Sequence, residues 1–298
     1  ITNSQLILLN VFELFTNPGK EFLLRAQQIS GWGKMKNSDI KPNLLLQSLE
    51  SSKVLIFDGG TGTYLQVKGL EPGGCPEQLN ITHPELIKTM ASQYFESGSD
   101  LVMTNTFGGN RFMLEKYQLG EHVEEFNRTG AELATKAAPP GKYVIGSIGP
   151  TGEFLAPLGS VSETVMLNAF KEQVSALADG GVDGIIIETM TSIEEASLAI
   201  KAARENTNLP VMATMTFDKG PRGLFTMMGV TPNQAAIQLQ NAGAHVVGSN
   251  CGNGIEVMVQ IARAMREATD GFLVINSNAG IPELLGGKVV YNETPEFL

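Results

Sequence analysis

The feature that most constrains the fold is a repeated alternation of short apolar runs with longer amphipathic segments, which starts near residue 53. The apolar runs are rich in Val and Ile and occupy residues 54–57, 101–104, 143–147, 184–187, 211–216, 245–248 and 272–275. Such continuous runs are typical of strands buried on both faces, as in a parallel sheet. The segments between them predict helices over 84–97, 121–138, 162–179, 192–206, 231–242 and 254–269. Three of these helices end in Ser-Gly-Ser-Asp, Gly-Gly-Val-Asp and Ala-Gly-Ala-His, each leading directly into a strand. The chain is therefore predicted to be built of βα units with right-handed crossovers.

Polar and Gly-rich residues gather where the predicted strands end. Asp-Gly-Gly-Thr-Gly-Thr (58–63), Asn-Thr-Phe-Gly-Gly-Asn (105–110), Glu-Thr (188–189) and Asn-Cys-Gly-Asn (250–253) each follow an apolar run. In an α/β protein of the (β/α)8 TIM barrel type the chemistry lies at the C-terminal ends of the strands, whereas a doubly wound open sheet binds at a switch point. We therefore expect a TIM barrel in preference to an open sheet. Because seven strands fall within the sequence, the barrel is expected to lack its last βα unit in this chain, with an eighth strand beginning shortly after Leu298.

Residues 1–50 have a different character, with frequent turn residues and no sustained period. We expect an N-terminal extension or linker of unknown role, with a short helix near 21–30 and another over 44–49 that leads into the barrel at 51–298. Because the chain begins with Ile1, it is expected to be a fragment or a processed product.

Composition narrows the classes of partner. A net charge of −10 and a pI of about 4.9 argue against nucleic acid, which needs clustered Lys and Arg. Two cysteines provide no disulfide framework, which favours a reducing compartment. The apolar stretch at 6–15 is too short to span a bilayer and lacks the features of a secretory signal. A cytoplasmic protein without nucleic-acid or membrane partners is expected.

Cys251 ends the sixth apolar run and enters a Gly-rich loop, which makes it a candidate metal ligand or nucleophile. Few partners are available, because the other cysteine is Cys75 and the histidines are His83, His122 and His245. His245 begins a strand at the end opposite the predicted site, so a structural role is expected. Cys75 is expected to be a loop thiol without catalytic importance.

The loop that begins at Asp58 does not match a dinucleotide fingerprint, because Leu65 occupies the position of the third glycine. The chain also has no Gly-Lys-Ser/Thr P-loop. The glycines are expected either to bring backbone N–H groups close to a small anion such as a carboxylate or to form a tight turn. Glu188 or Asp58 could instead act as the base of a metal-independent lyase, although no suitable Lys ends a predicted strand.

Five segments together resemble the homocysteine S-methyltransferase family. They are residues 54–64, 100–107, Ser-Ile-Gly-Pro-Thr-Gly (147–152), Gly-Val-Asp-Gly-Ile-Ile-Ile-Glu-Thr (181–189) and Gly-Ser-Asn-Cys-Gly (248–252). The resemblance runs in unbroken order from about residue 45 to 298. Pro-Glu-Gln-Leu-Asn (76–80) and Asn-Ala-Gly-Ile-Pro (278–282) are most similar to the cobalamin-dependent branch. The family fold is a (β/α)8 barrel, in agreement with the strand pattern.

The resemblance implies a set of site residues. The family binds zinc through three cysteines, of which Cys251 matches one; the other two are expected in a Cys pair beyond Leu298. Asn278 resembles an asparagine beside the zinc and is a further candidate ligand. Glu188 is expected to bind the α-amino group of homocysteine, and Asp58, Gly59 and Gly60 to receive the polar end of the amino acid. Asn105, Thr106 and Gly149 are expected to line the pocket or to fix its loops.

The function that the resemblance implies is zinc-dependent methyl transfer to the thiol of homocysteine, giving methionine, with Cys251 as the catalytic metal ligand. Methylcobalamin on a separate domain or partner protein is the expected donor. Two alternatives stay open: a methyltransferase that acts on another thiol or on a corrinoid protein, and a non-catalytic barrel that serves as a binding module. Because one thiolate alone would hold zinc weakly, the chain as it stands is expected to be inactive without the two further ligands.

Overall fold

The computed structural model describes residues 44–50, 54–280, 283–285, 288–290 and 293. The predicted helix near 21–30 lies outside these residues. The first half of the described chain contains α2 (Leu44–Glu50), α3 (Thr61–Val67), α4 (Leu79–Thr82), α5 (Pro84–Glu96), β1 (Leu101–Met103), α6 (Arg111–Glu115), the 3-10 helix η1 (Gly120–His122), α7 (Val123–Ala137) and β2 (Tyr143–Ile148). It continues with α8 (Glu163–Asp179), β3 (Gly184–Met190), α9 (Ile193–Asn206), β4 (Val211–Met215), β5 (Asp218–Gly220), β6 (Gly223–Phe225), α10 (Pro232–Ala242), β7 (Val246–Asn250), α11 (Ile255–Ala268), β8 (Phe272–Asn276), β9 (Glu283–Leu285) and β10 (Lys288–Val290).

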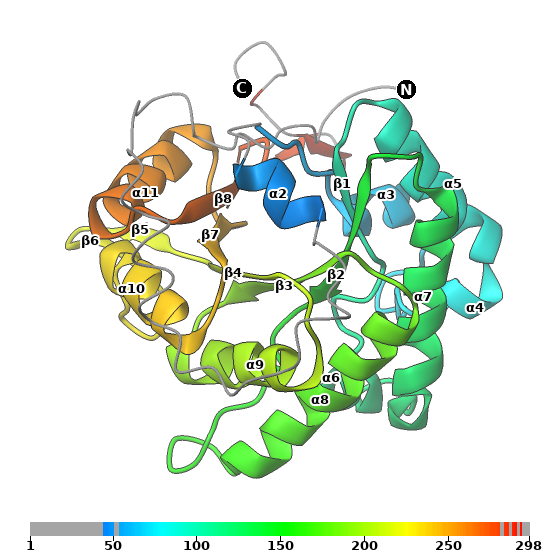
Figure 1. The fold of residues 1–298 in the computed structure, drawn as a ribbon, viewed down its shortest axis with the longest axis horizontal. Helices are drawn as coiled ribbons and strands as arrows, with labels where there is room; N and C mark the ends of the chain where they lie inside the picture. The colour runs from blue at the N-terminus through cyan, green and yellow to red at the C-terminus, as the bar shows by residue number, and fades with distance from the viewer. Residues whose placement is uncertain (1–43, 51–53, 281–282, 286–287, 291–292, 294–298) are drawn as a thin grey trace.

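The main sheet is parallel and its strands follow chain order, β1-β2-β3-β4-β7-β8. A doubly wound sheet would reverse that order at a switch point, so the open-sheet alternative is wrong. Figure 1 shows the sheet curling around a centre, with the larger helices outside it. β5 with β6, and β9 with β10, form separate antiparallel pairs. Among the described residues, no further parallel strand follows β8. The chain is thus an α/β protein with a curled parallel sheet.

The predicted secondary structure is largely confirmed, with one difference at the first strand. All six predicted helices form, and the helix expected over 44–49 is α2. Of the predicted first strand, Phe57 alone forms a bridge, to Leu101. Its neighbour Ile56 donates its backbone N–H to the Asp100 carboxylate at 3.1 Å, while the carbonyl of Ile56 accepts from the backbone of Asp100 and Leu101. A side chain therefore replaces part of the regular ladder at this edge.

The three similar helix–strand junctions share one structural device. Asp100 accepts the N–H of Ile56, Asp183 accepts the N–H of Val144 at 2.8 Å, and Nδ1 of His245 accepts the N–H of Val211 at 2.9 Å. Each side chain at a strand start thus binds the beginning of the preceding strand. Burial and the nearby Arg204 lower the pKa of His245 to about 4, so the ring is neutral and Nδ1 is free to accept at neutral pH. The structural role expected of His245 lies here.

Helix starts explain why the outer helices begin where they do. Ser162, Ser192 and Thr231 accept the N3 backbone N–H of α8, α9 and α10, and Thr231 forms a full capping box with Gln234. These caps satisfy backbone donors that the first turn leaves unpaired. Gly243, with φ of 109°, ends α10 in the left-handed conformation that glycine adopts without a Cβ penalty.

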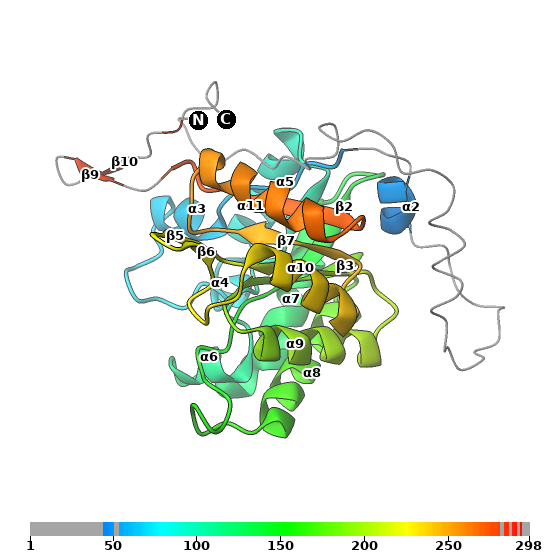
Figure 2. The same cartoon turned by 90° about the vertical axis from the view of Figure 1, so that its left-hand side faces the viewer.

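Two hydrophobic cores lie on opposite faces of the sheet. The outer core joins the sheet to helices such as α8 and α9 and includes Phe170 and Ile185. The inner core contains Ile145, Ile186, Met212 and others, together with Leu45 and Leu49 of α2. Because α2 packs into the inner core, the described part of residues 1–50 adjoins the barrel-like unit. Figure 2 shows α2 at one end of the molecule and the β5–β6 and β9–β10 pairs at the other. The parallel strands finish at this second end, where the candidate site lies.

Candidate functional site

A cavity of about 330 Å³ lies at the C-terminal ends of the parallel strands. Of the site residues predicted from the sequence, all except Gly149 line it: Asp58, Gly59, Gly60, Asn105, Thr106, Glu188, Cys251 and Asn278. These residues span more than 200 positions of sequence, and the common direction of the strands brings them together. Among the described residues that line the cavity, none is Lys, Arg or His. The cavity is therefore built to accept positive charge.

Glu188 lies near the end of β3, with its carboxylate buried in the cavity wall. The hydroxyl of Ser147 donates to Oε1 at 2.5 Å, and Nδ2 of Asn250 donates to Oε2 at 3.1 Å. Burial raises the pKa of Glu188 to about 7, although the Ser147 hydrogen bond opposes the rise. A cation beside this carboxylate would favour its charged form and remove part of the burial cost.

Asp58 follows the bridge at Phe57 and is only 4 % exposed. Its Oδ2 accepts the N–H of Met103 at 2.8 Å, while Oδ1 is buried with no hydrogen-bond partner among the described residues. Burial raises the pKa of Asp58 well above its ordinary value, and the negative charge of Glu188 adds to the rise. This buried acceptor is therefore able to accept a hydrogen bond from a group that enters the cavity.

Cys251 directly follows β7 and is partly buried. Its backbone has φ of 58°, a left-handed conformation that is uncommon for residues other than glycine and costs of order 1–3 kcal/mol. Burial, followed by the charge of Glu188, raises the pKa of the thiol. Asn278 reaches the same cavity and donates its backbone N–H to the carbonyl of Asn253 in the Cys251 loop at 3.1 Å. Without a cation nearby the Cys251 thiol stays protonated at neutral pH.

Asn105 and Thr106 form part of the opposite wall and are held by buried hydrogen bonds. Nδ2 of Asn105 donates to the carbonyl of Pro76 at 2.8 Å and to Oδ1 of Asn80 at 3.0 Å. The hydroxyl of Thr106 donates to the carbonyl of Ser147 at 2.8 Å. Both side chains are thereby committed to fixing the wall, so their polar groups position the pocket.

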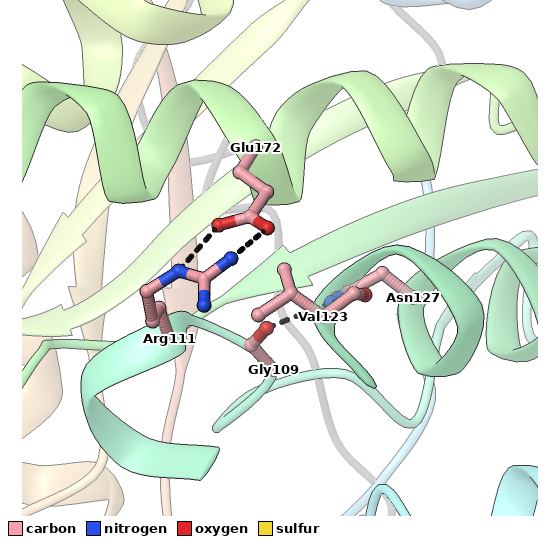
Figure 3. Close-up of polar contacts among 5 residues, drawn as sticks. All are labelled: Gly109, Arg111, Val123, Asn127 and Glu172. Atoms are coloured by element: carbon pink, nitrogen blue, oxygen red, sulfur yellow. Dashed lines mark hydrogen bonds and ion pairs between the residues drawn. The ribbon is translucent and has the colours of Figure 1, made fainter. Parts of the chain in front are cut away.

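The loop that carries Asn105 and Thr106 continues to Gly109 and Arg111, where contacts from α7 and α8 hold it (Figure 3). Nδ2 of Asn127, on α7, donates to the carbonyls of Gly109 and Val123 at 2.7 Å each. At the start of α6, Arg111 forms a two-point ion pair with Glu172 of α8. The outer ion pair is exposed and contributes little to stability, whereas the buried amide fixes the loop.

Gly149, expected to line the pocket or fix a loop, lies outside the cavity lining. Its N–H donates to the carbonyl of Phe107 at 2.8 Å, and a Cβ at this position would press on the Phe107 ring at 2.6 Å. Phe107 itself lines the cavity. Glycine is therefore required here so that the Phe107 loop can approach closely.

Sequence reasoning missed several cavity residues, chiefly Glu77, Ser147, Thr189 and Asn250. Ser147 and Asn250 lie near strand ends, and strand alternation could have indicated that they face the same interior as Glu188. Glu77 comes from a loop and offered no such signal. Its carboxylate accepts the N–H of Gly108 at 2.7 Å and the thiol of Cys75 at 3.4 Å, and burial raises its pKa.

No group of three or more His, Cys, Asp or Glu side chains that could hold a metal ion occurs among the described residues. Within the same part of the chain, no helix is both long and apolar enough to cross a bilayer.

Comparison with known proteins identifies the family. The profile of the homocysteine S-methyltransferase family matches residues 55–298. The sequence is 32 % identical over 257 residues to a methionine synthase of Mycobacterium tuberculosis, which covers 80 % of this chain and 21 % of that protein. It is 30 % identical over 231 residues to betaine–homocysteine S-methyltransferase 1 of Sus scrofa, covering 75 % of this chain and 80 % of that protein. The chain belongs to the homocysteine S-methyltransferase family, as the sequence motifs predicted.

Solved structures support the fold. The oxidised form of the homocysteine methyltransferase MmuM from Escherichia coli matches with a TM-score of 0.67 at 21 % identity, over 78 % of this chain and 85 % of that one. Its metallated form matches with a TM-score of 0.66 at 20 % identity, over 76 % and 85 %. The chain spans about a fifth of the length of the methionine synthases it matches.

Proposed function

We propose that this protein transfers a methyl group to the thiol of homocysteine, giving methionine, in a (β/α)8 barrel. The observation that carries the proposal is the composition of the cavity: Asp58, Glu188 and Cys251 converge in it, and no basic side chain is among its described lining residues. Such a site suits a ligand that has both an ammonium group and a thiol. Family membership supplies the reaction class.

Glu188 and Asp58 are proposed to bind the α-amino group. Both carboxylates are buried, and burial raises the pKa of each. Their charged forms are therefore unfavourable while the cavity holds no cation. An ammonium group that donates to the unpaired Oδ1 of Asp58 and contacts Glu188 would offset the cost of burying their charge. The substrate carboxylate is proposed to lie against the backbone of Gly59 and Gly60, where α3 begins without a side-chain cap.

Cys251 is proposed to contribute one thiolate ligand to a zinc ion. Its thiol lines the cavity and is held near the neutral amide of Asn250, which donates to Sγ at 3.5 Å. Asn278 is proposed as a further oxygen ligand. One thiolate and one amide do not complete a zinc site, so two further cysteine ligands are proposed to complete it.

When bound, zinc lowers the pKa of a thiol that contacts it and so makes the thiolate available as the nucleophile. The homocysteine thiol loses its proton to solvent, its sulfur forms a bond to the methyl carbon, and the bond between methyl and donor breaks with the electron pair left on the donor. The protein's own groups orient the substrate: the carboxylates hold the amine, and the buried wall at Asn105 and Thr106 limits water around the sulfur.

The donor is proposed to be methylcobalamin carried by a separate domain or partner. The matched region makes up 21 % of each methionine synthase that the chain resembles, which leaves most of such a protein available to carry the donor. Homocysteine is the proposed small-molecule substrate.

Zinc analysis tests the ligand assignment with a matched pair of cysteine variants in the full-length protein. Cys251→Ala is expected to lose the zinc, because a ligand is removed, while Cys75→Ala is expected to retain it, because Cys75 contacts Glu77 in a buried loop. Zinc content that is unchanged in Cys251→Ala would remove this residue from the metal site. Loss of zinc in both variants would point to general unfolding and would contradict a specific role of Cys251.

A further inference from the structure

The side-chain amide of Asn250 lies between the Glu188 carboxylate and the Cys251 thiol in the cavity. It is 2 % exposed and stands at the last position of β7. Its Nδ2 donates to Oε2 of Glu188 at 3.1 Å and to Oγ1 of Thr189 at 2.7 Å, with Sγ of Cys251 at 3.5 Å sharing the same donors. Its Oδ1 accepts from the hydroxyl of Thr214 at 2.7 Å and from the N–H of Thr189 at 2.8 Å. One side chain thus touches both groups that are proposed to meet the substrate.

The orientation of this amide is fixed by its partners. A backbone N–H can only donate, so the atom that faces the N–H of Thr189 must be the amide oxygen. The NH₂ group is then directed at the carboxylate of Glu188, which accepts from it. A rotated amide would place donor against donor on one side and acceptor against carboxylate on the other. Asn250 can therefore contact the Glu188 carboxylate only as a hydrogen-bond donor, through Nδ2.

The backbone around this amide explains why it is needed. β3 pairs with β4 at Ile187 and again at Met190, with one extra residue on β3 between them, which is a β-bulge. Thr189, inside the bulge, has φ of 61°, an outlier for a β-branched residue. The bulge removes the N–H of Thr189 from the sheet ladder, and Oδ1 of Asn250 accepts it instead. The adjacent Cys251 has the second left-handed backbone of the cavity.

We propose that Asn250 is a positioning residue that keeps the amine-binding carboxylate of Glu188 in register with the thiol site at Cys251, and so makes the protein select thiols that carry an α-amino group. This inference rests on the proposed binding of homocysteine. A misplacement of about 1 Å can lower the rate of a reaction between positioned groups by up to about 100-fold. Loss of the hydrogen bonds of Asn250, here called the Asn250 clamp, is therefore expected to weaken recognition of the amine most strongly.

The test compares L-homocysteine with 4-sulfanylbutanoate, which has the same thiol and carboxylate but lacks the amino group. Calorimetric dissociation constants are measured for both thiols with the full-length protein, and the ratio of the two reports amine recognition. Asn250→Ala removes the amide. Thr214→Val, which keeps nearly the same side-chain shape, removes the hydroxyl that donates to Oδ1 of Asn250 and leaves Asn250 itself unchanged. Ser249→Ala is the matched control, because Ser249 precedes Asn250 on the opposite face of β7 and its hydroxyl has no partner among the described residues.

The wild-type protein is expected to prefer homocysteine by about 10- to 100-fold, the size of a charge-assisted hydrogen bond. Asn250→Ala is expected to lower that preference at least tenfold, mainly by weakening homocysteine binding, and Thr214→Val to lower it by a smaller factor. Ser249→Ala should leave it unchanged. In a Glu188→Gln background, Asn250→Ala should produce no further loss, because its effect passes through Glu188.

Three results would overturn the inference. A wild-type preference that survives in both Asn250→Ala and Thr214→Val would show that the clamp does not act on recognition. Binding of both thiols that is weakened equally in Asn250→Ala would assign Asn250 a merely structural role. A full further loss of the homocysteine preference on adding Asn250→Ala to the Glu188→Gln background would do the same. A wild-type protein that binds neither thiol, or binds both equally, would refute the proposed function itself, and the wild-type measurement alone identifies that failure.

Discussion

Replacement of Glu188 by Gln should make the protein more stable at neutral and alkaline pH while removing the proposed amine site. The carboxylate is 8 % exposed, and its burial raises the pKa from 4.5 to about 7. At about 1.4 kcal/mol for each pKa unit, holding the charged form in the folded state costs about 3 kcal/mol. Gln can keep both contacts, because its oxygen accepts from Asn250 and its NH₂ donates to Oγ of Ser147.

The sign of the effect follows from proton linkage. Below pH 4.5 the carboxyl group is protonated in both the folded and the unfolded protein, so the wild type carries no ionisation cost. As the pH rises from 4.5 to 7 the unfolded chain ionises first, and the wild type loses stability. Above pH 7 the loss reaches its full value of about 3 kcal/mol. The advantage of Glu188→Gln should therefore grow between pH 4.5 and 7 and then remain constant.

Urea unfolding of the ligand-free, zinc-free protein at pH 4.5, 6 and 8 measures this difference directly. Glu96→Gln, at an exposed position at the end of α5, is the control and should change the unfolding free energy by less than about 0.5 kcal/mol at each pH. A Glu188→Gln protein that is destabilised equally at pH 4.5 and pH 8 would refute the argument, because the buried charge would then carry no cost.

Three further predictions concern single side chains. Asp58→Asn keeps an acceptor for the N–H of Met103 but loses the charge on the unpaired oxygen, so homocysteine affinity measured by calorimetry should fall about 10- to 100-fold; unchanged affinity would place the amine elsewhere. Gly248→Ala would drive a Cβ into the carbonyl of Val274, so the unfolding free energy should fall by about 3 kcal/mol, and a tolerated substitution would contradict the packing of β7 on β8. Thr231→Ala should destabilise the protein by about 1 kcal/mol in chemical denaturation through loss of the α10 capping box, whereas no change would mean that the cap is dispensable.

The sequence was informative wherever one physical rule acted over a whole segment. Apolar runs and amphipathic periods located the parallel strands and all six predicted helices, because burial on both faces of a strand and on one face of a helix leaves a strong pattern. The ends of those strands also indicated the cavity, since parallel strands present their C-terminal ends together. Glu188 and Cys251 were found in this way.

What escaped prediction depends on local exceptions and long-range contacts. The β-bulge places Thr189 at positive φ, a conformation that β-branched residues disfavour. The local sequence therefore gives no signal of the bulge. The Asn250 clamp follows from that bulge and was missed with it. At the first strand, the carboxylate of Asp100 takes a backbone N–H from Ile56, an exchange that hydrophobic periodicity does not report. Glu77 reaches the cavity from a loop, where no period places a side chain.

Methionine formation tests the central claim most directly. The full-length protein, loaded with zinc, is incubated with homocysteine and separately with methylcobalamin, S-methylmethionine or betaine, and methionine is quantified by mass spectrometry. Methionine is expected with methylcobalamin, and its formation should be lost in Cys251→Ala and retained in Cys75→Ala. Absence of methionine with all three donors, in a protein that holds zinc and binds homocysteine, would contradict the proposed methyl transfer.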